Sequence, residues 1–353
     1  MDSETIEVRQ GESFDLEALA RYMRGRIEDL PEGDLEVRQF PSGASNLTYL
    51  LKVADWEGVL RRPPLGPVPP KAHDMRRESK VLSHIHPAFP LAPKPYFFCE
   101  DESVIGAPFY IMERRRGVIL DETFPEGYEP TPELCLGISE TVVETLVELH
   151  SVDWREAGLE NLGRQEGFLE RQVKGWIERY DKAKTEEVEE VGPLTDWITN
   201  NVPESPGPTI IHNDYKLNNL IIDPDELTEV RAVLDWEMTT IGDPLFELGI
   251  SMSYWLEPGD SEDLKKVMPT VTSMPGFLTR DEFMELYAEK SGRDLSNKRF
   301  YLTLGYFRLA AALQQIYARW YRGQTKDERF ARFGDGVKDL LLHAHHLAFS
   351  DAT

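Results

Sequence analysis

The segment IIHNDYKLNNLIID, residues 210–223, sets polar side chains between two pairs of isoleucines. His212, Asp214 and Asn219 stand in the spacing H-x-D-x-x-x-x-N. A carboxylate can accept the proton of a bound hydroxyl, and an amide oxygen can join a second carboxylate in holding Mg²⁺. The segment AVLDWE supplies such a carboxylate, Asp235, at the end of an apolar run. Together these groups are the parts that phosphoryl transfer requires.

Two more carboxylates follow closely. Glu237 lies two residues after Asp235, on the same side of an extended segment, so it is either a further metal or substrate contact or a solvated side chain. Asp243 begins DPLFELG, where an acidic residue, a proline and an apolar run indicate the N-cap of a helix. Capping is therefore the expected role of Asp243.

The chain that must position these residues changes character from about residue 131. Before it, aromatic and branched residues between Gly and Pro predict strands, and helical spacing of apolar residues predicts helices. Residues 34–116 are expected to form a small, mostly antiparallel sheet with one helix, preceded by a leading helix. The expected strands are 47–54, 57–63, 94–101 and 106–117, and the expected helices are 14–27 and 71–85.

The second part of the chain is predicted to be mainly helical. Long amphipathic patterns cover residues 133–154, 168–183, 299–322 and 336–349. We therefore predict an α+β fold in two lobes, with residues 1–116 as the N-terminal lobe and residues 117–353 as the C-terminal lobe.

Composition limits the classes of partner. The formal net charge of −24 argues against non-specific binding to nucleic acid or to an anionic membrane, both of which require clustered positive charge. The chain has two cysteines without metal-site spacing, and its start lacks the pattern of a signal peptide. A cytoplasmic protein is expected. The sequence does not fix its oligomeric state.

The motifs HNDYKLNN and LDWEMTTIGDPLFELG resemble those of the aminoglycoside phosphotransferase and choline kinase family of protein-kinase-like small-molecule kinases. SNLTYLL, VLRRPP, AHDMRRE and SVIGAPFYIMERRRG resemble the branch fused to acyl-CoA dehydrogenases in eukaryotes. The resemblance implies a two-lobed protein-kinase-like fold. It implies that Asp214 is the catalytic base, that Asn219 and Asp235 bind Mg²⁺ and that His212 supports the loop. It also implies that Asp243 braces this loop.

The nucleotide site that the resemblance implies has weaker motifs. PSGASNLTY contains one glycine, and Ser45 and Asn46 are the candidates for contacts with phosphate, although an ordinary turn explains the same letters equally well. Arg61 stands where most of the family has a phosphate-binding lysine, with Glu78 as its expected partner. The alternative is that Arg61 is simply a basic residue on an edge strand.

The adenine contacts implied by the family pattern fall in FYIMERRRG. Backbone groups near Glu113 and Arg115 would meet the edge of the base, and Val59 and Leu234 would enclose its ring. Apolar residues such as these two are more often simply part of a core.

The resulting expectation is an enzyme that uses ATP and Mg²⁺ to phosphorylate a hydroxyl of a small molecule. The acceptor is expected to be a hydroxyacyl-CoA or a hydroxy acid, as in the resembling branch. An aminoglycoside or choline-like amino alcohol is the alternative that fits the acidic balance of the chain. Arg61 and the glycine-poor turn leave open a catalytically inactive nucleotide-binding module.

Overall fold

The computed structural model describes residues 4–41, 46–65 and 74–350. The chain divides into two compact units. Unit 1 comprises Met1–Arg116 and Arg231–Glu237, and unit 2 comprises Gly117–Val230 and Met238–Thr353. Each unit is described by itself below.

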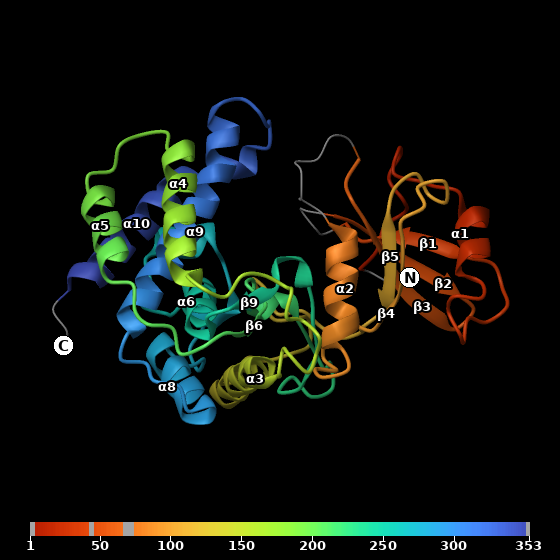
Figure 1. Cartoon of the computed structure of the whole chain (residues 1–353), viewed down its shortest axis with the longest axis horizontal. Helices are drawn as coiled ribbons and strands as arrows, with labels where there is room; N and C mark the ends of the chain where they lie inside the picture. Colours follow the sequence, from red (N-terminus) through yellow and green to blue (C-terminus); the bar gives the residue numbers. More distant parts are fainter. Residues whose placement is uncertain (1–3, 42–45, 66–73, 351–353) are drawn as a thin grey trace. The chain divides into compact units, whose positions relative to one another are not determined.

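Unit 1 contains a five-stranded sheet in the order β1-β2-β3-β5-β4, and every neighbouring pair is antiparallel (Figure 1). The sequence prediction missed the short first strand. The elements are α1 (Leu16–Met23), β1 (Glu36–Gln39), β2 (Leu47–Val53), β3 (Trp56–Arg62), α2 (Met75–Ile85), β4 (Pro95–Cys99) and β5 (Phe109–Glu113).

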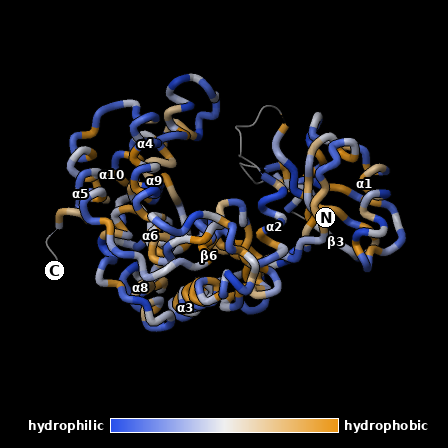
Figure 2. The backbone as a smooth tube through the Cα atoms, viewed as in Figure 1, coloured by the Kyte–Doolittle hydropathy of each residue, from blue (hydrophilic) through white to orange (hydrophobic). Residues whose placement is uncertain are grey.

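The two faces of this sheet differ in chemistry because successive side chains of a strand point to opposite faces. Leu60 packs into a core with Tyr49, Ile111 and residues of α1. Arg61, the next residue of β3, faces the other way and contacts Glu78 of α2. Helix α2 carries many hydrophilic residues (Figure 2). One face is thus a core and the other carries charged groups.

The segment Arg231–Glu237 belongs to unit 1, although the sequence analysis placed it in the second part of the chain. It includes most of β8 (Val230–Val233). The backbone N–H of Val233 donates to the carbonyl of Leu91 at 2.9 Å, and the Trp236 ring packs edge-on against Phe89. These long-range contacts explain the difference, because local sequence pattern does not reveal them.

Unit 2 is mainly helical, with one two-stranded antiparallel pair of β6 and β9. The fold class predicted from the sequence, a small antiparallel sheet with a mainly helical remainder, is confirmed. The elements are α3 (Pro132–Ser151), α4 (Phe168–Ala183), α5 (Val191–Asn200), β6 (Thr209–Ile211), η1 (Leu217–Asn219), β7 (Leu220–Ile222), β9 (Thr240–Gly242), α6 (Pro244–Tyr254), α7 (Glu262–Val267), η3 (Val271–Ser273), α8 (Arg280–Ser291), α9 (Lys298–Tyr321), η4 (Glu328–Phe330) and α10 (Phe333–Phe349).

Helix α6 lies in the centre of unit 2 and packs closely against α9 (Figure 1). Glycines make this approach possible. A Cβ atom added at Gly249 would lie 2.2 Å from the carbonyl oxygen of Tyr301, and one added at Gly305 would lie 2.1 Å from the carbonyl oxygen of Gly249. The pair of glycines therefore fixes how α6 and α9 cross. No helix within the described ranges is long and apolar enough to cross a membrane.

Candidate active site

The loop of residues 212–219 connects β6 to β7 in unit 2 and carries Asp214. The Asp214 carboxylate accepts a hydrogen bond from Asn219 Nδ2 at 2.9 Å, and Lys216 Nζ lies 3.1 Å from its Oδ2. The Asp214 side chain is 21% exposed. It is thus oriented from within its own loop and remains accessible to a small molecule.

The start of this loop is anchored by Glu247 of α6, whose side chain is fully buried. Its carboxylate accepts the backbone N–H groups of His212, at 3.0 Å, and of Asn213. Hydrogen bonds to an ionised acceptor are stronger than neutral ones. Glu247 therefore fixes the two peptide groups that immediately precede Asp214.

A buried histidine completes the anchor. His150 Nε2 lies 2.8 Å from Glu247 Oε2, and His150 Nδ1 lies 2.7 Å from the Tyr287 hydroxyl. Burial lowers the pKa of His150 below its usual value, because desolvation outweighs the attraction of Glu247. A neutral imidazole with Nε2 protonated can donate to Glu247 and accept from Tyr287.

Asn213 adopts a left-handed conformation, with φ of 68°, which asparagine tolerates better than most residues. Arg308 donates to its carbonyl at 3.0 Å, and its own side chain donates to the carbonyl of Met238 at 3.0 Å. Asp243 caps α6 as expected, accepting the N–H groups of Leu245 and Phe246. The residue before Asp214 is thus held through its N–H, C=O and side-chain groups.

Unit 1 carries a second polar cluster around Arg61, whose side chain is only 11% exposed. Its guanidinium forms an ion pair with the buried Glu78. Arg61 Nη2 also lies 3.4 Å from Asp235 Oδ1 and 3.9 Å from Glu237 Oε2. One cation therefore gathers three carboxylates, two of which come from the segment that follows β8.

Burial and charge act in opposite directions on this cluster. Burial raises the pKa of Glu78 to about 7, and Arg61 limits the rise. Burial alone would lower the pKa of Arg61, but Tyr110 and the carboxylates of Glu78, Asp235 and Glu237 raise it above its usual value. Arg61 is a fixed positive charge in unit 1 at any pH that the protein tolerates.

Three further residues predicted for the nucleotide and metal sites are Ser45 and Asn46, which precede β2, and Asp235, which follows β8. Asn46 is buried, and its Nδ2 donates to Glu237 Oε2 at 3.0 Å. Ser45 lies outside the described residues. Asp235 has a left-handed backbone, with φ of 69°, a conformation that costs energy in a non-glycine residue and that is concentrated at functional sites.

The residues predicted to meet adenine also lie in unit 1. Glu113 ends β5, and its backbone N–H donates to the carbonyl of Lys94 at 2.8 Å. Arg115 pairs with the Glu113 carboxylate at 3.0 Å. Val59 is buried, on the same face of the sheet as Arg61, and Leu234 is half-buried after β8. The assignment of these residues to adenine stays a prediction.

A cavity of about 450 Å³ in unit 2 adjoins the loop of Asp214. Its volume is within the range of small-molecule sites. Lys216 and Asn218 line it from the loop, and helices α6 and α9 contribute several residues each. Among the lining residues that the structure describes, Asp121 is the one carboxylate. The apolar lining residues include Val142, Leu217, Met252, Trp255, Val267, Met268, Phe283, Leu309, Leu313, Ile316 and Phe333.

The structure thus distributes the predicted site residues over both units. Asp214 and Asn219 meet in unit 2, and Arg61, Glu78 and Asp235 meet in unit 1. Sequence reasoning gave no role to Lys216 or Glu247. A signal for Glu247 existed, since it is the single charged residue of the apolar helix PLFELGISMSY.

Comparisons with known proteins agree with this architecture. Residues 36–268 match the model of the family described as Phosphotransferase enzyme family. Acyl-CoA dehydrogenase family member 11 of Gallus gallus is 36% identical over 347 residues, which are 95% of this chain and 44% of that protein. The chain spans between 30% and 44% of the length of the curated relatives that it matches.

Solved structures show the same fold. A protein of Ralstonia eutropha, provisionally assigned as an aminoglycoside phosphotransferase, matches with a TM-score of 0.83 and 30% identity, over 97% of this chain and all of that one. A thermostable mutant of aminoglycoside phosphotransferase APH(4)-Ia, in a ternary complex with AMP-PNP and hygromycin B, matches with a TM-score of 0.59 and 14% identity, over 90% of this chain and 96% of that one.

Proposed function

The chain belongs to the phosphotransferase enzyme family, and on this premise we propose that it transfers the γ-phosphoryl group of ATP to a hydroxyl of a small molecule held in unit 2. The observation that carries the proposal is the pairing of an accessible carboxylate with a cavity. Asp214 is held by Lys216 and Asn219, and Lys216 and its neighbours line about 450 Å³ of mainly apolar space.

In this reaction Asp214 orients the acceptor hydroxyl and takes its proton. The acceptor oxygen bonds to the γ-phosphorus while the bond from that phosphorus to the β–γ bridging oxygen breaks, which yields a phosphate monoester and ADP. Lys216 keeps a positive charge beside Asp214 and can offset the charge that develops on the transferring group.

The donor atoms present suit Mg²⁺. Asn219 commits its amide nitrogen to Asp214, which leaves its Oδ1 as a neutral oxygen donor, and Asp235 receives Arg61 on Oδ1. No group of three His, Cys, Asp or Glu side chains within the described ranges could hold a metal. Mg²⁺ in kinases takes few protein ligands and completes its shell with phosphate oxygens and water. We propose Asn219 and Asp235 as its protein ligands. When bound, the ion would neutralise phosphate charge.

Arg61 is proposed to bind phosphate oxygens in place of the family's usual lysine. Its ion pair with Glu78 holds the guanidinium still, and an arginine fork can contact two oxygens at once. Asp235 and Glu237 also lie against Arg61 and help to hold its guanidinium in position. The cation that would meet the phosphate is therefore already in place before the nucleotide binds.

For the acceptor we favour a hydroxyacyl-CoA or hydroxy acid. The cavity is lined mainly by apolar side chains, which suit an acyl chain, and the curated relatives are named acyl-CoA dehydrogenases. An aminoglycoside, as in the hygromycin B complex of the 14% identical relative, carries several positive charges. A cavity in which Asp121 is the one acidic residue among the described lining residues offers poor compensation for these charges.

The test begins with thermal-shift titrations of ATP and Mg²⁺, followed by ATP consumption against pooled hydroxyacyl-CoAs, hydroxy acids, choline and aminoglycosides. With the acceptor that responds, Asp214→Asn should lower turnover by about 10² to 10⁴ and leave ATP affinity nearly unchanged. Asp225→Asn, at an exposed carboxylate outside the site, is the matched control. Nucleotide binding without consumption of ATP against any pool would instead support an inactive binding module.

A further inference from the structure

The cavity beside the Asp214 loop is mainly apolar, but its wall contains a buried hydroxyl. Ser251 lies on α6, is 4% exposed and lines the cavity. Its Oγ has no hydrogen-bond partner. Serine in a helix often bonds a carbonyl of the preceding turn, as Ser253 does with Ile250 at 2.7 Å. Ser251 makes no such bond, and it lines the cavity with its hydroxyl left without a partner.

Several other polar groups of the lining are already engaged. The Tyr215 hydroxyl donates to the carbonyl of Val142 at 2.7 Å, and Asn218 Nδ2 donates to Asp121 at 3.0 Å. Lys216 pairs with Asp214 and lies over the Tyr254 ring. Asn218 Oδ1 is also without a partner, but it belongs to the loop of Asp214. Among the described α6 residues that line the cavity, Ser251 is the one with a buried hydroxyl that has no partner.

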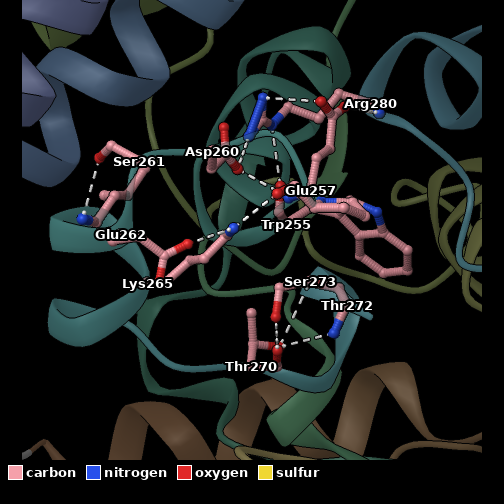
Figure 3. A network of polar contacts seen from close by, with 12 residues as sticks. Trp255, Glu257, Asp260, Ser261, Glu262, Lys265, Thr270, Thr272, Ser273 and Arg280 are labelled. Atoms are coloured by element: carbon pink, nitrogen blue, oxygen red, sulfur yellow. Dashed lines mark hydrogen bonds and ion pairs between the residues drawn. The ribbon is translucent and has the colours of Figure 1, made fainter. Parts of the chain in front are cut away.

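A network of paired charges holds part of the cavity wall. Figure 3 shows Arg280 of α8 pointing at the carboxylates of Asp260 and Glu257 and at the backbone of Trp255. In the same view Thr270 contacts Thr272 and Ser273. Trp255, Thr270 and Thr272 line the cavity. The network therefore helps to fix the positions of these three residues, and its charged side chains are paired with one another.

We propose that Ser251 is a specificity-determining residue, which hydrogen-bonds a second, uncharged polar group of the acceptor, distinct from the hydroxyl that receives phosphate. This inference rests on the proposed function for the identity of the cavity as the acceptor site. The group is uncharged because a hydroxyl cannot compensate a buried ion. The part of the acceptor that lies in the cavity is therefore an apolar body with two separate polar points.

Binding of simple probes to the full chain, without nucleotide, tests the proposal. The affinities for 1-octanol and for 1,8-octanediol are measured by calorimetry. In the ratio of these two affinities, the contribution of the shared apolar chain cancels. Ser251→Ala should shift this ratio against the diol by about three- to tenfold, as expected for one lost hydrogen bond. Ser251→Cys, which keeps the size of the side chain and a weak donor, should give a smaller shift.

Thr303→Val is the matched control, because Thr303 carries an equally buried and unpaired hydroxyl that does not line the cavity. The ratio of the two probe affinities in Thr303→Val should equal that of the wild type. An unchanged ratio in Ser251→Ala, or no binding of either probe to the wild type, overturns the proposal. A chain that shows the expected shift but consumes no ATP with any acceptor contradicts the proposed function alone.

Discussion

Glu247 is the residue on which the position of Asp214 should depend most, although it cannot touch the substrates from its buried place on α6. In Glu247→Gln the side chain keeps its shape but has one acceptor oxygen instead of two. Glu247 Oε2 faces His150 and the N–H of His212, and Oε1 faces the N–H of Asn213. Whichever way the amide turns, its NH₂ group meets a buried donor.

The magnitude follows from this geometry. At least one buried N–H loses its acceptor, and the others lose a charged partner, so we expect a loss of about 2–4 kcal/mol in unfolding free energy. A displacement of the reacting carboxylate by about 1 Å can lower turnover roughly 10²-fold. Affinity for ATP should stay close to that of the wild type, because Arg61 and Glu78 belong to unit 1.

The assay combines urea unfolding, followed by tryptophan fluorescence, with ATP consumption at saturating acceptor. Gln314→Leu is the control for a purely structural loss. Gln314 is buried on α9 and donates to the carbonyl of Ala183 at 3.0 Å, away from the loop. The Gln314→Leu variant should lose stability and keep the turnover of the wild type. If Glu247→Gln kept turnover within twofold of the wild type, the view that Glu247 positions Asp214 would be refuted.

Two other residues give further predictions. The lowered pKa of His150 means that the unfolded chain takes up a proton near pH 6.5 before the native chain does, so this contribution to stability is present above pH 6.5 and is lost as pH falls below it. His150→Gln should lack that part of the pH dependence in melting curves between pH 5 and 8, and identical slopes would argue against it. Arg61→Met should weaken ATP binding about tenfold or more in calorimetry, through loss of a charged hydrogen-bond donor; unchanged affinity would remove Arg61 from the phosphate site.

The elements of both units were largely predictable because their patterns are local. The helix at 168–183 begins and ends where its apolar spacing predicted, and β2, β3 and β4 end within one or two residues of the predicted strands. Strand β5 is shorter than the predicted strand 106–117, by three residues at its start and four at its end. The short strand β1 was missed because EVRQ has no apolar alternation. Its place in the sheet comes from pairing with β2, a contact that no local pattern encodes.

The chemistry of the site was predictable only where spacing within one segment defines it. Asp214 and Asn219 are five residues apart, and their contact is set by the loop that carries both. The groups that hold this loop are different: Arg308 and Tyr287 come from helices far along the chain, and they read as ordinary members of amphipathic patterns. Burial, which turns an ordinary glutamate into the anchor of the loop, is a property of the folded chain alone.

The polar clusters around Asp214 and around Arg61 are held rigid by different kinds of interaction. Around Asp214, rigidity comes from neutral and backbone groups converging on one buried carboxylate, Glu247. Around Arg61 it comes from one cation shared by three carboxylates, so removal of that cation leaves mutual repulsion behind. The buried Glu78 accepts the guanidinium of Arg61 and holds it in place, so the position of this cation depends on its partner. The arginine and its glutamate should be exchanged together or not at all.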